Sequence, residues 1–227
     1  MLVVIEEFIS IADVKRYRAA LDAVDWADGS ATAGSLAATV KHNQQLPDSA
    51  PQAVTLGNEL LSRMGSHPTF VSAVMPMKIH PPRFNRYGVG QSYGAHVDGS
   101  VMALPGTDTV LRSDVSGTLF LSDADDYEGG ELIIETEFGA QAVKLRAGDL
   151  VLYPSGSLHR VAEVTRGQRL AAILWAQSMV KDSSARSMLF DLDQTIQSLT
   201  VNAPTAAADV LQLTSIYHNL VRRWADV

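Results

Sequence analysis

Cysteine is absent from this chain of 227 residues, and its absence excludes three kinds of chemistry at once. Disulfide bonds, thiolate metal sites and cysteine nucleophiles all require a sulfhydryl group. Any metal site in this protein must therefore use histidine and carboxylate ligands.

An excess of basic residues is also missing, because 18 Lys and Arg face 25 Asp and Glu for a net charge of -7. Surfaces that bind nucleic acid or anionic membrane carry the opposite excess. The longest apolar run, Leu170–Ala176, is far below the roughly 18 to 20 residues that span a bilayer. Met1–Ile9 is apolar but lacks the length and basic residues of a signal peptide, so we interpret it as a strand. We expect a cytoplasmic protein that binds neither nucleic acid nor membrane.

Two helices are predicted before residue 70. Ser10 with Asp13 three positions on is typical of a helix N-terminus, and apolar residues at helical spacing continue through Leu21. A second helix is expected from about Pro51 to Met64. Between them, residues 29–49 show no sustained period, and we expect a loop in which His42 to Gln45 line the mouth of a cleft.

From Phe70 the pattern changes to short β-prone runs separated by Gly, Asp and Pro turns. The predicted strands are 71–79, 82–87, 118–121, 131–135, 141–145, 150–153, 160–164 and 169–177. About eight such strands favour a double-stranded β-helix, or jelly roll. The fold class is thus mainly β with flanking helices.

Helical spacing returns over 185–199 and 211–224, with Pro204 between the two segments. We expect this C-terminal helical pair to cover the barrel, and the alternative is a contact between copies in a homo-oligomer. The predicted parts are 1–69, the N-terminal strand and helices; 70–180, the jelly-roll core; and 181–227, the C-terminal extension.

The stretch Gln91–Gly99 contains His96 and Asp98, which are two residues apart. On an extended strand their side chains point to the same side, so both can reach one ion. His159 is the best third ligand, because it lies between the strand-like runs 149–154 and 160–164. Two imidazoles and one carboxylate on one face of a metal leave the opposite face open, as in non-haem Fe(II) oxygenases.

Arg169 follows His159 by ten residues, across the turn 165–168. If that turn is tight, Arg169 faces a point about five residues, or roughly 17 Å, along the His159 strand. An imidazole, a metal, a short dicarboxylate and an arginine span a similar length. The guanidinium is therefore predicted to bind the far carboxylate of 2-oxoglutarate in a bidentate pair.

The segment 85–98, Asn-Arg-Tyr-x-x-Gly-Gln-x-Tyr-x-x-His-x-Asp, resembles the signature of prolyl-4-hydroxylase-type 2-oxoglutarate oxygenases. Over almost the whole chain the sequence resembles the bacterial PKHD-type hydroxylases of the PiuC group. Further matching motifs lie at 117–122, 127–132, 147–154, 157–161 and 216–220.

This resemblance implies Fe(II) on His96, Asp98 and His159, and 2-oxoglutarate on Arg169 with Tyr87 as a second donor. It also implies O2 as co-substrate, L-ascorbate (vitamin C) as reductant, and an oxidoreductase that hydroxylates an unactivated C–H bond. The family name suggests prolyl or lysyl hydroxylation, and the PiuC group suggests a link to iron uptake. A peptide, an amino acid and a siderophore all stay open as substrates.

Other side chains are predicted to have supporting roles. Gln91 or Ser157 is expected to orient the metal ligands. The loop 101–113 is expected to close over the substrate as a lid. Further pocket candidates are Tyr93, Arg112, Asp114 and Gln177.

Two rival functions stay open for the same triad. The first is a zinc-dependent hydrolase, with a water in the fourth metal position. The second is a non-catalytic, cupin-like sensor of a small acid or a metal. In the zinc hydrolase, Arg169 and Tyr87 would lack a purpose. Both rivals predict no succinate from Fe(II), O2 and 2-oxoglutarate.

Overall fold

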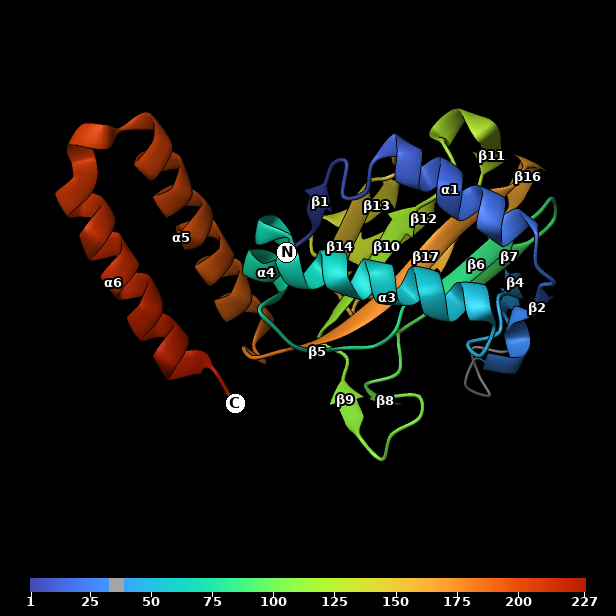
Figure 1. Cartoon of the computed structure of the whole chain (residues 1–227), viewed down its shortest axis with the longest axis horizontal. Helices are drawn as coiled ribbons and strands as arrows, with labels where there is room; N and C mark the ends of the chain where they lie inside the picture. Colours follow the sequence, from blue (N-terminus) through green and yellow to red (C-terminus); the bar gives the residue numbers. More distant parts are fainter. Residues whose placement is uncertain (33–38) are drawn as a thin grey trace.

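The computed structural model describes residues 1–32 and 39–227, and two antiparallel sheets dominate it (Figure 1). The larger sheet has the order β1-β14-β10-β17-β6-β4-β2, and β5 also pairs with β17. Its strands are β1 (Val3–Ile5), β2 (Ala27–Asp28), β4 (Gln44–Gln45), β5 (Pro76–Ile79), β6 (Arg83–Tyr87), β10 (Val115–Phe120), β14 (Leu150–Pro154) and β17 (Arg169–Ser178).

The smaller sheet has the order β13-β12-β15-β7-β3. Its strands are β3 (Lys41–His42), β7 (Ser92–His96), β12 (Leu132–Thr136), β13 (Gly139–Val143) and β15 (His159–Val161). Two short pairs complete the described strands: β8 (Val101–Ala103) with β9 (Val110–Arg112), and β11 (Tyr127–Gly129) with β16 (Val164–Gly167).

Side chains alternate between the two faces of the larger sheet, and both faces are buried. On β10, Leu119 joins the core beneath the N-terminal helices, whereas its neighbour Phe120 joins a second core. That second core includes Ile134 of β12 and Val161 of β15, so the two sheets face each other across it. Successive strand residues point to opposite faces, which explains the division.

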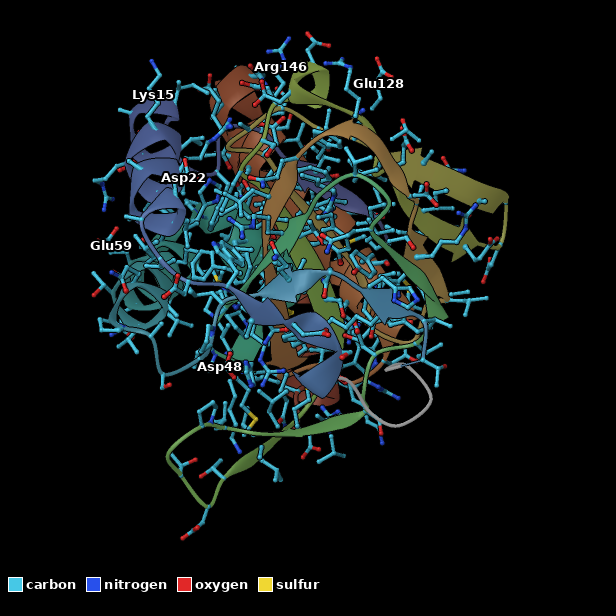
Figure 2. The ribbon with its side chains drawn as sticks, turned by 90° about the vertical axis from the view of Figure 1, so that its right-hand side faces the viewer. Lys15, Asp22, Asp48, Glu59, Glu128 and Arg146 are labelled. Atoms are coloured by element: carbon cyan, nitrogen blue, oxygen red, sulfur yellow. The ribbon has the colours of Figure 1, made fainter. Side chains whose placement is uncertain are left out.

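The N-terminal helices are α1 (Ile11–Asp22), α3 (Pro51–Ser66) and α4 (Pro68–Val74), and α1 and α3 lie across the larger sheet (Figure 1). As predicted, Ser10 caps α1 by accepting a hydrogen bond from the backbone N–H of Asp13. Lys15, Asp22 and Glu59 lie on the outer side of these helices (Figure 2). The polar face thus meets solvent while the apolar stripe covers the sheet.

The sequence prediction of a strand over 71–79 was wrong for its first half. Residues 68–74 form α4, because His67 accepts a hydrogen bond from the backbone N–H of Phe70 and Pro68 occupies the first turn. Met75 then ends the helix in the left-handed conformation, with φ of 47°, and β5 follows. Local capping outweighed the β propensity of this segment.

The C-terminal helices α5 (Ser183–Asn202) and α6 (Ala207–Trp224) form the predicted pair, joined by a short 3-10 turn at Pro204–Ala206. They project from one end of the molecule and do not cover the sheets, contrary to expectation (Figure 1). The start of α5 and the end of α6 attach the pair to the rest of the protein: Ala185 and Leu189 form a core with Met75 and Val180, and Val221 and Trp224 of α6 pack against it. No residue described in α6 is fully buried.

Candidate active site

Three predicted ligands meet between the sheets. His96 ends β7, His159 begins β15, and the two are directly opposite in the strand pairing. Asp98 follows β7 by two residues rather than lying on it. One ligand atom from each of the three lies within 4.8 Å of the others, and their side chains are 6 to 10% exposed. The structure therefore brings together the triad that the sequence indicated.

Both imidazoles are oriented by backbone carbonyls. His96 Nδ1 lies 2.8 Å from the carbonyl oxygen of Gly94, and His159 Nδ1 lies 3.0 Å from that of Ser157. Because a carbonyl only accepts, each Nδ1 carries the proton and each Nε2 keeps a lone pair. These Nε2 atoms lie 4.0 Å and 3.9 Å from Asp98 Oδ1, so all three ligand atoms converge.

A hydrogen bond from a neighbouring strand fixes the orientation of the Asp98 carboxylate. Ser116 of β10 donates a hydrogen bond to Asp98 Oδ2 at 2.5 Å, and its hydroxyl lies 2.8 Å from that of Ser155. This leaves Oδ1 directed at the two imidazoles. The prediction that the Gln91 side chain orients a ligand was wrong: it accepts from the backbone N–H of Gly88. Ser157 acts through its carbonyl, and Ser116 was missed.

Burial keeps His96 in the form that binds a metal. It lowers the pKa of His96 to about 4, with the neighbouring His159 as the second cause. The ring of Tyr93 stacks on His96 with 3.6 Å between centroids. A neutral imidazole at neutral pH is the ligand state that divalent metals require.

Arg169 lies deep in the same cavity and is only 1% exposed. Its neighbour across β6 is Tyr87, and the guanidinium carbon lies 5.3 Å from the ring centroids of both Tyr87 and Phe120. None of its three nitrogens has a hydrogen-bond partner among the described residues. A buried cation without an acceptor is costly, and an anion bound in the cavity would offset that cost.

The tight hairpin that we expected between His159 and Arg169 does not exist. The strand predicted over 160–164 is divided between β15, in the smaller sheet, and β16, which pairs with β11. β17 then runs in the larger sheet. The ten-residue spacing therefore carries the chain from one sheet to the other, and Arg169 reaches the cavity from the opposite wall.

The cavity has a volume of about 610 Å³, within the range of small-molecule sites. It includes the triad, Arg169 and Tyr87, and Tyr93 lines it as expected. The hairpin β8–β9 contributes Val101 to Ala103 to the wall, although closure of this segment stays a prediction. Lining residues that the sequence did not single out are Lys41, His80, Arg83, Asn85, Tyr153 and Trp175.

Three further pocket candidates were wrong. Arg112 and Asp114 form an ion pair at 2.7 Å, and Gln177 accepts a hydrogen bond from the backbone N–H of Arg112. None of the three lines the cavity. Within the predicted loop 29–49, Gln45 lines the cavity as expected, whereas His42 does not. Residues 33–38 of that loop lie outside the described part of the chain.

Comparison with known proteins agrees with this geometry. Residues 82–177 match the 2OG-Fe(II) oxygenase superfamily, and residues 183–226 match the PKHD-type hydroxylase C-terminal domain. A PKHD-type hydroxylase of Teredinibacter turnerae is 56% identical over 225 residues, with 99% of both chains covered.

Solved structures show the same fold. A Pseudomonas putida prolyl-4-hydroxylase aligns with a TM-score of 0.54 at 22% identity, over 78% of this chain and 92% of that one. HygX of Streptomyces hygroscopicus, with nickel, 2-oxoglutarate and hygromycin B bound, aligns with a TM-score of 0.55 at 16% identity, over 79% and 84%. Among the described residues, no helix combines the length and apolarity needed to cross a membrane. The predicted resemblance is confirmed: the chain belongs to the PKHD-type hydroxylases and is a 2-oxoglutarate-dependent oxygenase of the Fe(II) superfamily.

Proposed function

We propose that His96, Asp98 and His159 hold Fe(II), and that Arg169 and Tyr87 hold 2-oxoglutarate, in an enzyme that hydroxylates an unactivated C–H bond. The donor set supports this assignment, because two neutral imidazoles and one carboxylate suit non-haem Fe(II). The proposal includes a jelly-roll core, and the two facing sheets, with these groups in one cavity between them, support it. Iron, when bound, supplies the oxidative chemistry in which 2-oxoglutarate becomes succinate and CO2.

The observation that carries the proposal is the guanidinium of Arg169. Its nitrogens have no acceptor among the described residues, and it shares a cavity with the triad. A dicarboxylate that reaches from the triad to Arg169 would give this cation its missing acceptors in a bidentate pair. A zinc hydrolase or a sensor of a metal alone would leave the cation buried without one, so both fit less well. A sensor of a small acid would also supply acceptors to Arg169, and it differs from the proposed enzyme in releasing no succinate.

The protein's own residues then have distinct tasks. Ser116 fixes the carboxylate of Asp98, and the carbonyls of Gly94 and Ser157 fix the imidazoles. The hydroxyl of Tyr87 is proposed as a second donor to the distal carboxylate. Burial raises the pKa of Tyr87, so this hydroxyl keeps its proton. The PiuC resemblance extends the proposal to L-ascorbate as reductant and to a link with iron uptake.

The test mixes the protein with Fe(II), ascorbate, O2 and 2-oxoglutarate and measures succinate. We expect slow release without a substrate, dependent on both Fe(II) and O2. The variant His96→Ala should abolish it, whereas His218→Ala, an exposed histidine of α6, should not. No succinate above a protein-free blank would contradict the proposal and favour the two rivals, which hydrolytic activity with zinc would then separate.

A further inference from the structure

The C-terminal helical pair has no task in the chemistry above. It projects beyond the sheets, and at 1.5 Å per residue the 20 residues of α5 and the 18 of α6 are roughly 30 Å and 27 Å long (Figure 1). From Phe190 to Val227, no residue whose burial the structure describes is buried. Helices in proteins are stabilised mainly by packing of an apolar face, and the outer part of this pair has little of that packing.

One face of the pair carries apolar side chains on both helices. Met188 of α5 and Trp224 of α6 line the same groove, so their sides of the two helices form one face of the pair. Residues at intervals of three, four or seven positions lie on the same side of a helix. The apolar face, so defined, consists of Met188, Leu192 and Leu199 on α5 and Leu213, Ile216, Leu220 and Trp224 on α6. None of these side chains is buried, and Met188 and Ile216 are 54% and 44% exposed.

The outer part of the pair is almost free of charge. Residues 194–221 contain one formally charged side chain, Asp209, although 19% of the whole chain is charged. Charged residues are usual on the solvent side of a surface helix, yet here the polar positions hold mostly Gln, Ser, Thr and Asn. The centre of a protein–protein contact is depleted of charge in the same way. The composition therefore indicates a surface that another protein covers.

The distribution of charge also indicates which protein covers it. In a two-fold contact the same surface meets itself, so an excess of one sign of charge would repel its copy. Residues 1–180 carry 14 Lys and Arg against 20 Asp and Glu, whereas residues 181–227 carry 4 against 5. Two copies of this acidic chain therefore meet with least repulsion through the helical pair. An anionic membrane or a nucleic acid would require basic residues, and 194–221 contains no Lys or Arg.

The size of the apolar face suits a stable dimer. Two helices of this length and about 10 Å in diameter, side by side, present a face of roughly 600 Å² before the relief of the side chains is counted. A standard interface buries about 800 Å² on each partner. The groove beside Met188 and Trp224 has a volume of about 780 Å³ and extends the same surface to Pro154 and Gly156, outside the pair.

We infer that two copies of this chain form a homodimer through the apolar faces of their α5–α6 pairs. Two antiparallel pairs packed face to face make a four-helix bundle, in which each pair covers the apolar side chains of the other. Because the pair projects from the sheets, the contact also keeps the two acidic bodies apart (Figure 1). The inference concerns assembly and does not depend on the metal or the co-substrate.

Sedimentation equilibrium of the full chain tests the assembly. We expect a species of twice 24.4 kDa, with a Kd of roughly 1 µM or lower, because standard-size interfaces range from micromolar to picomolar. Hydrogen exchange then locates the contact. Amides of residues 194–221 should become more protected as the protein concentration rises through the Kd, whereas amides of the β12–β13 hairpin should not.

Charged variants assign the contact to one face. Ile216→Asp and Met188→Asp place like charges in the contact of two copies, and each should raise the Kd at least about 100-fold. Leu211→Asp is the matched control, because Leu211 is 72% exposed on α6 but lies about 140° around the helix from Ile216. This variant should stay dimeric. Far-UV circular dichroism shows whether each variant folds, and if Ile216→Asp does not, Met188→Asp and the hydrogen exchange of the unchanged protein still decide.

A chain that stays monomeric well above micromolar concentration would overturn the inference. So would a dimer that survives both Ile216→Asp and Met188→Asp, or one that Leu211→Asp disrupts equally, because the contact would then lie on another surface. A monomer that binds phosphatidylcholine vesicles through 194–221 would also overturn it and assign the apolar face to lipid. None of these results bears on succinate release, which tests the proposed function separately.

Discussion

Arg169→Met should make the cofactor-free protein more stable. The arginine is buried, its three nitrogens have no acceptor among the described residues, and the rings of Tyr87 and Phe120 favour its charge. Burying an uncompensated ion costs several kcal/mol, whereas each cation–π contact returns about 1 to 2 kcal/mol. We expect the free energy of unfolding to increase by about 1 to 3 kcal/mol. For a chain of this length, each kcal/mol raises Tm by roughly 2 to 4 °C.

The same substitution should remove the response to 2-oxoglutarate. With Mn(II) bound, the co-substrate at a hundred times its Kd stabilises the wild type by about 2.7 kcal/mol. Loss of a bidentate charged pair, at about 1.5 to 3 kcal/mol for each hydrogen bond, weakens binding more than roughly a hundredfold. The variant should therefore show no shift at that concentration in thermal unfolding.

Arg186→Met is the matched control, because Arg186 is also buried, at 3% exposure, but donates to the carbonyls of Val180 and Lys181. Its loss leaves buried carbonyls without donors and should destabilise the protein by about 1 to 3 kcal/mol. If Arg169→Met instead destabilises the cofactor-free protein as Arg186→Met does, or keeps its shift with 2-oxoglutarate, the reasoning is refuted.

Three further predictions test other parts of the account. Ser116→Ala frees Asp98 Oδ2 and should weaken Mn(II) binding about 10- to 100-fold in calorimetry, and an unchanged affinity would rule out this orienting role. Lys41 has a pKa lowered from 10.5 to about 8 by burial, so the unfolded chain holds the extra proton between these values. The free energy of unfolding should therefore rise with pH from 8 to 10.5 by up to about 3 kcal/mol relative to Lys41→Met, and parallel curves would contradict the burial of this charge. Gly129→Ala places a Cβ 1.9 Å from the carbonyl oxygen of Glu163 at φ of +69° and should cost more than about 2 kcal/mol in denaturant unfolding, whereas Gly156→Ala meets open space; equal effects would show that the crowding is relieved elsewhere.

The convergence of His96 and Asp98 could be predicted because the signal is local. His96 and Asp98 are two residues apart on an extended segment, which places them on one side whatever the sheet order. Arg169 was assigned to the cavity correctly but through a hairpin that does not form. The apolar residues that follow Arg169 in the sequence indicated that it is buried. Which strand pairs with the Arg169 strand depends on the order of strands in the sheet, and a single sequence does not encode that order locally.

The missed residues had no local signal. Ser116 is one serine in a buried strand, and its contact with Asp98 joins positions 18 residues apart. Lys41 lies on a two-residue strand, and only pairing with β7 turns a lysine inward. Helix α4 was missed because Phe70 and Val71 favour strands, and the cap at His67 decides otherwise. The C-terminal helices were predicted from the helical spacing of their apolar residues. That spacing does not indicate which surface the apolar face packs against.

Anomalous diffraction from crystals grown with Mn(II) and 2-oxoglutarate tests the central claim most directly. We predict one strong metal peak at coordination distance from His96 Nε2, Asp98 Oδ1 and His159 Nε2, with density for the distal carboxylate against Arg169. A peak at any other group of side chains, or a dicarboxylate turned away from Arg169, would contradict the account.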